Sequence, residues 1–523
     1  MRSLPAYGEF DLDLPVVTVS RNAEFIVVRD GAKLKVVTHR GEPHATVDAL
    51  FDRGDPMWAR YGISPDGTLL AEADSARVRV VQLPEGNELW SETTHEIGDL
   101  WGPLVFSPDS TRLALPQQGH VAIVDSRRST VVADIGAAND WVIDRGHGPR
   151  HNSAYGLVLT CRVDFSEDQE RIAALCDSNE RSPRNHTVFV ASLAEPARVT
   201  ELYGHADGVE GVAFGDGHEV VTNDGRGTLR WFDADGALLA SVDAGRYFAG
   251  DLNVSPGEGS VSTFHRKYLG GTWSRASEKA TAVPNRNRFV TVTPTGEAWS
   301  LSDQGAMTKP RVVAPRHVPL VTYSPATQRA QRAVWQIARG AYDVAATALQ
   351  GTHDADKFVT AQQLVAFKRA GGEDFGAFLQ RPDAPASAPA GAPALAADFV
   401  DGGFGDLAVE VFRAWLAIDG KATRPEDERA RMLAVALELF DLRLSTLRTV
   451  ELAKIVFDAW PNDAAALDAY ATLTRLDDPE LGLKTVQDFV HRNPQSVAAW
   501  RMLADIMVHT DRARFDEVLA RAG

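Results

Sequence analysis

Two histidines four residues apart, His147 and His151, have a spacing that could bind a metal ion. This spacing places both imidazoles on one face when the segment is an α-helix. Here Gly148 and Pro149 lie between them, and neither residue favours a helix. Because a metal site in a protein usually needs three or four ligands, we expect no metal at this pair.

The two cysteines, Cys161 and Cys176, are too few for a disulfide scaffold. Both follow aliphatic residues in segments that we expect to be adjacent strands of one sheet. With apolar neighbours and no lysine nearby, they are interpreted as buried structural thiols. The chain also lacks a Gly-x-Ser-x-Gly elbow, a Walker A sequence and a dinucleotide-binding glycine pattern between a strand and a helix. We therefore assign no catalytic residue and expect no cofactor.

Basic and aromatic residues gather in three segments that we predict to be loops on one face of a repeated β-structure. The residues in these loops are Arg145, His147, Arg150, His151, Arg181, Arg184, His186, His265, Arg266, Lys267 and Tyr268. Arginine suits bidentate recognition of carboxylates and phosphates, so we predict that this face binds acidic or phosphorylated segments of other proteins. The alternative is that they are ordinary solvated loop residues.

The overall charge limits the choice of partners. The chain has 71 acidic and 54 basic side chains, which gives a net charge of −17. Such a field disfavours nucleic acids and anionic membranes as partners. The start, MRSLPAYGEFDLD, has neither the basic nor the apolar region of a signal peptide, and no long apolar run follows. These features predict a cytoplasmic protein. Only ten of the 54 basic residues are lysine, and this preference for arginine over lysine is typical of GC-rich bacteria.

The elements that must position these loops repeat along the first 315 residues. Short runs with alternating apolar residues end in similar turns, which is typical of small antiparallel strands. The second turn residues are Ser20, Ser64, Ser107, Ser166, Gly215 and Ser255, with spacings of 44, 43, 59, 49 and 40 residues. A period of about 40 to 45 residues predicts the four-stranded blades of a β-propeller.

One segment resembles the WD40 family. It contains Gly204-His205 before a strand, Thr222 in the next, and Trp231-Phe232-Asp233 at the end of a third. The resemblance implies a hydrogen-bonded network across the blade. The chain departs from the family pattern at Arg226, where the family has Asp, and at Phe232, where it has Trp. The resemblance covers about 310 residues and implies a fold, not a ligand.

The number of blades stays open at this point. Six turns are clear, and strands expected at 279–283, 288–293 and 297–301 favour seven blades, with six possible. Residues 10–14 could complete the last blade, and residues 319–323 could form a partial eighth. We place the propeller at residues 1–325.

After residue 325 the apolar period changes to that of a helix, as in Ala330, Val334, Ile337 and Ala341. We predict a helical segment at 326–380, a Pro/Ala-rich linker at 381–397 and an α-helical domain at 398–523. In the last of these, an offset of 33 residues aligns Pro461 with Pro494 and three further pairs. This arrangement resembles tetratricopeptide (TPR) repeats; a plain helical bundle is the alternative.

A propeller joined to helical hairpins favours a non-enzymatic interaction scaffold or adaptor, with the propeller face and the helical groove binding separate partners. Two alternatives remain: an enzyme with its active site in the central channel of the propeller, and a sensor subunit of a bacterial signalling or defence system. The sequence does not indicate the oligomeric state.

Overall fold

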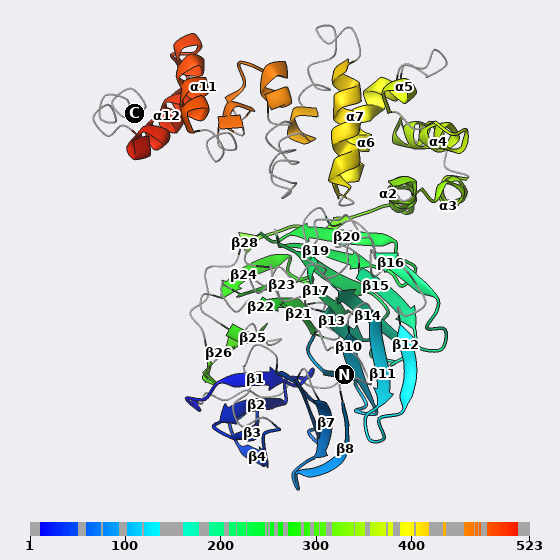
Figure 1. Cartoon of the computed structure of the whole chain (residues 1–523), viewed down its shortest axis with the longest axis vertical. Coiled ribbons are helices and arrows are strands. Elements are labelled where there is room, and N and C mark those ends of the chain that lie inside the picture. Colours follow the sequence, from blue (N-terminus) through cyan, green and yellow to red (C-terminus); the bar gives the residue numbers. More distant parts are fainter. Residues whose placement is uncertain are drawn as a thin grey trace. The chain divides into compact units, whose positions relative to one another are not determined.

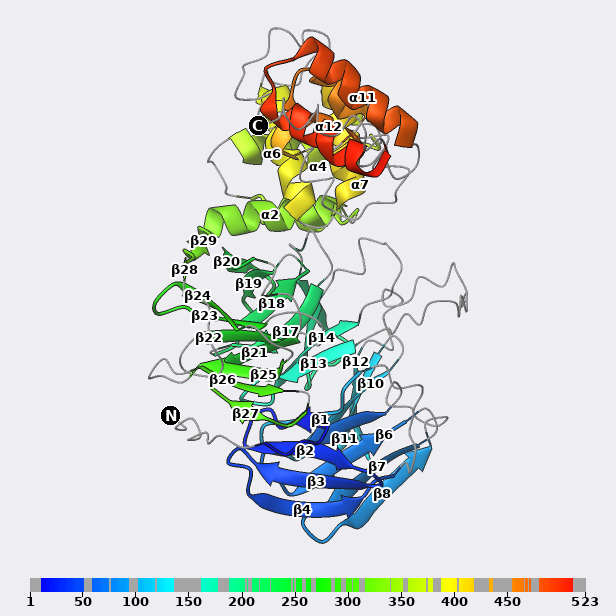
Figure 2. The ribbon, with the colours of Figure 1, turned by 90° about the vertical axis from the view of Figure 1, so that its left-hand side faces the viewer.

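The computed structural model divides the chain into two compact units, Met1–Ser324 and Pro325–Gly523, which we describe separately (Figures 1 and 2). The residues that the structure describes are 11–50, 59–74, 77–93, 102–117, 120–135, 161–176, 188–202, 205, 209–215, 217–225, 227–245, 248, 251–255, 260–264, 270–283, 287–292, 298–302, 304–309, 316–338, 340–350, 356–372, 375–379, 387–401, 404–417, 432–435, 454–464, 466–468, 470–471 and 479–510.

The described part of the first unit contains seven antiparallel sheets, numbered here in chain order. The first sheet comprises β1 (Val16–Val19), β2 (Phe25–Asp30), β3 (Lys33–Thr38) and β4 (Pro43–Asp48), and the second β5 (Arg60–Ile63), β6 (Leu69–Ala73), β7 (Arg77–Gln82) and β8 (Asn87–Thr93). The third comprises β9 (Val105–Phe106), β10 (Arg112–Gln117), β11 (His120–Asp125) and β12 (Val131–Ile135), and the fourth β13 (Cys161–Phe165), β14 (Arg171–Cys176), β15 (Val188–Ser192) and β16 (Val199–Leu202).

The fifth sheet comprises β17 (Val209–Phe214), β18 (Val220–Asp224), β19 (Thr228–Phe232) and β20 (Leu238–Asp243), with β29 (Val321–Thr322) added at its edge. The sixth comprises β21 (Asp251–Ser255), β22 (Ser260–Phe264), β23 (Gly270–Ser274) and β24 (Lys279–Val283), with β28 (Arg316–His317) added. The seventh comprises β25 (Asn287–Val292), β26 (Ala298–Ser302) and β27 (Met307–Thr308). The predicted blade-like antiparallel sheets are confirmed.

Apolar clusters join sheets that follow one another in the chain. Phe165 of β13 packs in a cluster with Ile123 of β11, which joins the third and fourth sheets. Trp231 and Trp273 join the fifth and sixth, with ring centroids 5.1 Å apart. Trp299 of the seventh sheet packs with Val28 of the first, so the two ends of the series meet. Because a single four-stranded sheet cannot bury both faces, this propeller-like packing supplies the core of the unit.

The repeated Ser-containing turns have one geometry, which explains why their sequence recurs. In the turn after β9, Ser107 Oγ donates to Asp109 Oδ1 at 2.7 Å and accepts from the backbone N of Arg112 at 2.9 Å. Equivalent pairs are Ser20–Asn22, Ser64–Asp66 and Ser166–Asp168. The residue three positions after each Ser has a positive φ, between 56° and 70°, at Ala23, Gly67, Ser110 and Gln169. Each turn thus joins the first two strands of its sheet tightly.

The segment after the seventh sheet passes along the outer edges of two earlier sheets. β28 pairs with β24 and β29 pairs with β20, each antiparallel. Between them Val318 is buried, and its carbonyl accepts from Trp273 Nε1 at 3.1 Å. The prediction of a partial eighth blade at residues 319–323 is therefore wrong. The outer strand β20 has backbone groups that no other strand of its sheet pairs with, and this segment pairs with them instead.

The N-terminal residues lie beside the seventh sheet. The backbone N of Leu14 donates to Gln304 O at 2.9 Å, and Leu12 and Leu14 pack against the cluster of Trp299 and Met307. In the described residues 11–14 no strand is formed, and Phe10 lies outside the described residues. The expectation that residues 10–14 complete the last blade is thus supported by position but not by strand pairing.

The cysteines were expected on adjacent strands, and the register agrees. Cys161 of β13 is the direct partner of Cys176 of β14. In the part of the chain that the structure describes, no helix is both long and apolar enough to cross a membrane.

The second unit is helical, as predicted. Its described helices are α2 (Pro325–Ala338), α3 (Tyr342–Ala348), α4 (Asp356–Arg369), α5 (Phe375–Leu379), α6 (Ser387–Asp401), α7 (Gly405–Ala417), α11 (Pro479–Arg492) and α12 (Val497–Thr510). α11 and α12 pack in one cluster that contains two pairs of the predicted 33-residue offset, Tyr470 with Leu503 and Ala471 with Ala504. Leu467 of the third pair also lies in this cluster, and its partner Trp500 packs against it. This packing is common to many helical hairpins, so the TPR assignment stays a prediction.

The predicted linker at 381–397 is wrong over most of its length, because α6 begins at Ser387. Six alanines between 387 and 401 favour a helix, and Pro389 lies in the first turn, where backbone N–H groups need no helical acceptor. Pro393 removes one helical hydrogen bond, but Leu395 and Phe399 on this helix are buried. Trp335 Nε1 of α2 also donates to Asp398 O at 3.2 Å. Packing therefore outweighs the cost of the internal proline.

Candidate functional site

The predicted partner-binding residues cannot be placed. Arg145, His147, Arg150, His151, Arg181, Arg184, His186, His265, Arg266, Lys267 and Tyr268 all lie outside the described residues. Their role stays a prediction, as does the expectation that His147 and His151 bind no metal.

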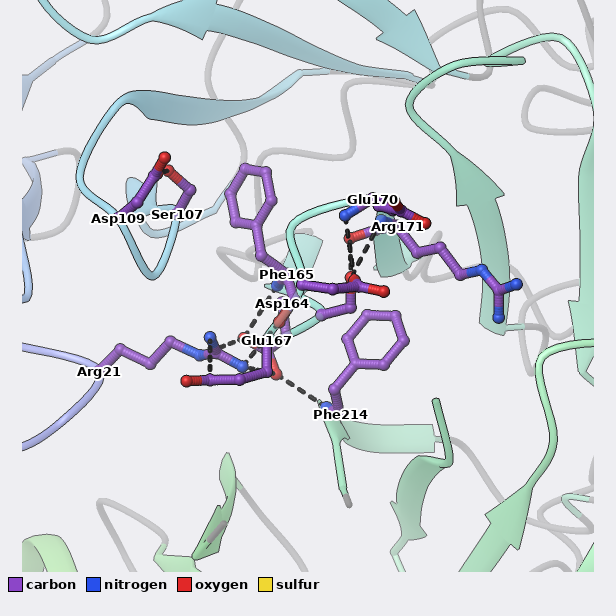
Figure 3. A network of polar contacts seen from close by, with 11 residues as sticks. Arg21, Ser107, Asp109, Asp164, Phe165, Glu167, Glu170, Arg171 and Phe214 are labelled. Carbon is purple, nitrogen blue, oxygen red and sulfur yellow. Dashed lines mark hydrogen bonds and ion pairs between the residues drawn. The ribbon is translucent and has the colours of Figure 1, made fainter. Parts of the chain in front are cut away.

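The described residues contain a different polar site, centred on an ion pair between Arg21 and Asp164 (Figure 3). Arg21 lies in the turn between β1 and β2, and Asp164 lies on β13. Arg21 Nε is 3.0 Å from Asp164 Oδ1, and Arg21 Nη2 donates to Phe165 O at 2.6 Å. The first and fourth sheets are not neighbours in the series, so Arg21 joins two sheets across the ring.

Asp164 is held by backbone donors as well as by the guanidinium. The backbone N of Phe214 on β17 donates to Oδ2 at 2.8 Å, and the backbone N of Phe165 donates to Oδ1 at 2.9 Å. The side chain is only 13% exposed. Burial raises the pKa of the Asp164 carboxyl, although Arg21 and the two backbone donors oppose the shift. A buried carboxylate with one cation and fixed donors is typical of a structural tie.

A second carboxylate lies beside the same arginine. Arg21 Nη1 is 3.6 Å from Glu167 Oε2, and the Glu167 side chain is 66% exposed. Nη1 is buried and makes no hydrogen bond to the described residues. Arg21 thus has a close, buried carboxylate and a more distant, exposed one.

Hydrogen bonds and ion pairs link the turns of successive sheets around this site. Asn22 Nδ2 donates to Pro65 O at 2.8 Å, and Arg112 donates to Gln169 O at 2.8 Å. His218 Nδ1 lies 3.4 Å from Asp168 Oδ2, and Arg275 lies 2.9 Å from Glu219. Each contact joins one sheet to the next. The first-to-second-strand turns, together with Arg275 in the third-to-fourth-strand turn of the sixth sheet, thus form a linked polar face.

Hydrogen bonds within the repeated turns lower the pKa of their aspartates. Burial alone would raise the pKa of Asp66 and of Asp109, but hydrogen bonds from the turn outweigh it and lower both. The donors to Asp109 include Ser107 Oγ and the backbone N of Thr111. The pKa of Asp168 is lowered in the same way. These carboxylates are stabilised as anions and are unsuited to act as general acids near neutral pH.

A buried network crosses the fifth sheet, where the sequence resembles the WD40 family. His205 Nε2 lies 2.7 Å from Thr222 Oγ1, and Arg230 Nη1 lies 2.7 Å from Asp224 Oδ2. Arg230 Nη1 also lies 3.1 Å from His205 Nδ1. Burial would raise the pKa of Asp224, but hydrogen bonding and the charge of Arg230 hold it far below its usual range.

Sequence reasoning missed the acid of this network. The family aspartate corresponds to Arg226, which lies outside the described residues, whereas Asp224, two residues earlier, supplies a carboxylate. The signal was present as an Asp at the end of β18, followed by a Gly-x-Gly turn. His205 and Thr222, which were matched correctly, do meet.

The second sheet has a simpler pair of the same kind. Glu72 on β6 is fully buried, and Arg79 on β7 lies 2.6 Å from Glu72 Oε1. Glu72 Oε2 accepts from the backbone N of Leu50, just after β4, at 3.0 Å. In both sheets a buried acid–arginine pair fixes the sheet and a segment that precedes it.

The chemistry available to these groups is limited. Arg21, Arg79, Arg230 and Arg275 each lie against a carboxylate. Each buried carboxylate of these pairs has two or more donors. Within the described ranges, no group of three His, Cys, Asp or Glu side chains is placed to hold a metal ion. The arrangement therefore holds sheets together, and the Thr222 hydroxyl, which lies 2.7 Å from His205 Nε2, is itself buried within the network.

No protein-family model and no curated protein sequence matches the chain. Among solved structures, it is similar to that of U3-55K, at 12% identity over 62% of this chain and 98% of that chain, with a TM-score of 0.39. It is also similar to BamB from Moraxella catarrhalis, at 11% identity over 55% of this chain and 80% of that chain, with a TM-score of 0.31. At these TM-scores the likeness carries no argument about the function of this chain.

Proposed function

We propose that this protein is a non-enzymatic interaction scaffold in which a seven-bladed propeller and a TPR-like helical unit bind separate proteins. The observation that carries the proposal is the Arg21–Asp164 ion pair. This ion pair uses charged groups to join the first and fourth sheets. An enzyme with an active site in the central channel would instead need such groups free to bind a substrate.

The linked turns support the same conclusion. Contacts such as Arg112 to Gln169 O and Arg275 to Glu219 join consecutive sheets at one face. A face held in this way is a rigid base for the loops at the other ends of the strands. Rigid scaffolds that display loops are common among binding proteins, because preorganisation lowers the entropic cost of binding.

The proposed partners are proteins with acidic or phosphorylated segments. The proposed contacts are the basic loop residues named above, of which Arg145, Arg150, Arg181 and Arg184 carry most of the charge. Arginine can bind a carboxylate or a phosphate with two parallel hydrogen bonds. On a chain of net charge −17, such a cluster would also select against basic partners.

An array of acidic, phosphorylated and neutral peptides tests this binding chemistry with the full chain. We expect the wild type to retain acidic or phosphorylated peptides and a variant with Arg145, Arg150, Arg181 and Arg184 changed to Glu to lose them. A matched control changes Arg127, Arg128 and Arg198, exposed arginines of other turns, to Glu. Equal retention by all three proteins would exclude the basic loops as the binding site.

A further inference from the structure

The two cysteines of the chain lie directly opposite each other on adjacent strands of the fourth sheet. Cys161 is the first residue of β13, and Cys176 is the last residue of β14. The antiparallel register between the two strands is regular, from the pair Phe165–Ile172 beside the turn to the pair Cys161–Cys176 at the far end. Because side chains alternate between the two faces of a sheet, two directly opposed residues share one face.

Hydrogen bonds at the turn show which kind of pair the cysteines form. The backbone N of Ser166 donates to Arg171 O at 3.0 Å, and the backbone N of Arg171 donates to Ser166 Oγ at 3.0 Å. Ser166 and Arg171 therefore form a hydrogen-bonded position of the ladder. Hydrogen-bonded and non-hydrogen-bonded pairs alternate along an antiparallel ladder. Cys161–Cys176 is the fifth pair from this position, which makes it a non-hydrogen-bonded pair.

This kind of pair matches the geometry of a disulfide bond. In a non-hydrogen-bonded pair the two Cα atoms are about 4.5 Å apart, and the side chains are closer than in a hydrogen-bonded pair. A disulfide needs Cα atoms about 4.4 to 6.8 Å apart. The backbone of β13 and β14 therefore holds the two cysteines within the range of a disulfide bond without any change of register.

We propose that Cys161 and Cys176 are a site of reversible disulfide formation, oxidised by a small-molecule disulfide such as oxidised glutathione. One cysteine thiolate attacks a sulfur of oxidised glutathione, whose S–S bond breaks and releases one glutathione thiol. The second cysteine thiolate then displaces the other glutathione and forms the Sγ–Sγ bond. The protein gives up two electrons and two protons, which leave in the two glutathione thiols. This modification goes beyond the scaffold function and does not depend on it.

The bond would cross-link the strands that carry the Arg21–Asp164 ion pair. Asp164 lies on β13 three residues after Cys161. The two cysteines are 15 residues apart in the chain, so the bond closes a loop that contains Asp164 and the turn at Ser166. A closed loop restricts the unfolded chain, so the oxidised fourth sheet should resist unfolding more than the reduced sheet does. In a reducing cytoplasm the dithiol form prevails, and the disulfide forms when the glutathione pool is oxidised.

Equilibration with glutathione tests the proposal on the full chain. Samples in a series of ratios of oxidised to reduced glutathione are quenched with acid, unfolded, alkylated and weighed by mass spectrometry. Equilibrium is approached from the reduced and from the oxidised chain. We expect the native chain to gain an internal disulfide, which accepts neither an alkyl group nor glutathione. Its equilibrium constant for oxidation should exceed that of the urea-unfolded chain by about tenfold or more, because the register holds the pair together.

A matched control keeps two cysteines but changes the face of one. The double variant Cys161→Ala, Arg162→Cys moves one thiol to the opposite face of β13. Its native chain should form the internal disulfide no more readily than its unfolded chain. If this variant does not fold, the comparison of native with unfolded wild type decides alone. The proposal is overturned if native wild type keeps two free thiols or gains only glutathione adducts at ratios that oxidise the unfolded chain, or if the two equilibrium constants are equal.

Discussion

Arg21 and Asp164 are 143 residues apart in the chain, yet Arg21 Nε lies 3.0 Å from Asp164 Oδ1. The contact joins the first sheet to the fourth, while the apolar clusters join each sheet only to its neighbours. Because it spans the series, its loss should affect the whole first unit.

We predict that Arg21→Gln lowers the free energy of unfolding by about 1 to 3 kcal/mol, since Asp164 is left without its cation. Arg21→Lys should restore little of the loss, because one ammonium cannot replace Nε and Nη2 together. Urea unfolding followed by tryptophan fluorescence measures both. A lysine variant as stable as the wild type would show that only charge is needed.

The network of the fifth sheet should be more sensitive. Asp224→Asn leaves the guanidinium of Arg230 largely buried without a counter-ion, so we expect a loss of about 3 to 5 kcal/mol. Thr222→Val removes only the hydroxyl that meets His205 and should cost about 1 to 2 kcal/mol. The same urea series ranks the two variants. The reverse order would show that the histidine contact, rather than the ion pair, holds the sheet.

The repeated turns predict the pH dependence of stability. Folding lowers the pKa of Asp66, Asp109 and Asp168 below the ordinary value of 3.8, so their contribution is fully present above that value. It is lost as the pH falls through the lower, folded-state pKa values. We expect the urea concentration at the unfolding midpoint to decrease as the pH is lowered below about 4. A variant with Asp66, Asp109 and Asp168 all changed to Asn should show a smaller decrease. Asp164, whose pKa is raised, has the opposite sign and does not cause this loss.

The packing of α6 can be tested where the sequence indicated a linker. Leu395 is buried on this helix, so Leu395→Ala should cost about 2 to 5 kcal/mol. Ala397→Ser, at a partly exposed position of the same helix, should change stability by less than about 0.5 kcal/mol. Circular dichroism during urea unfolding reports on the helical unit. An unstructured tether would tolerate both substitutions equally.

Local patterns predicted the features that depend on local interactions. The Ser-Pro-Asp turns were found because Ser and Asp must stand two residues apart to bond within the turn. That Cys161 and Cys176 lie on adjacent strands followed from the alternating segments on either side of one turn, whereas their direct pairing is a finding of the structure. The change to a helical period after Pro325 was predicted for the same reason.

Features that depend on distant contacts were missed. Nothing near Arg21 indicates Asp164, and nothing near residues 316–323 indicates the outer strands β20 and β24. α6 was missed because its prolines suggested a linker, whereas burial of Leu395 and Phe399 favours the helix. The basic loops that the sequence favoured as a binding site lie outside the described residues, so they stay a prediction.

The central claim, that the protein is a scaffold for other proteins, is tested most directly by affinity capture of the full-length chain from its native host, with mass spectrometry to identify and quantify bound proteins. We predict that defined partners co-purify with the wild type in near-stoichiometric amounts and that the four-arginine reversal loses those with acidic or phosphorylated segments. Recovery of the chain alone, at every expression level, would contradict the account.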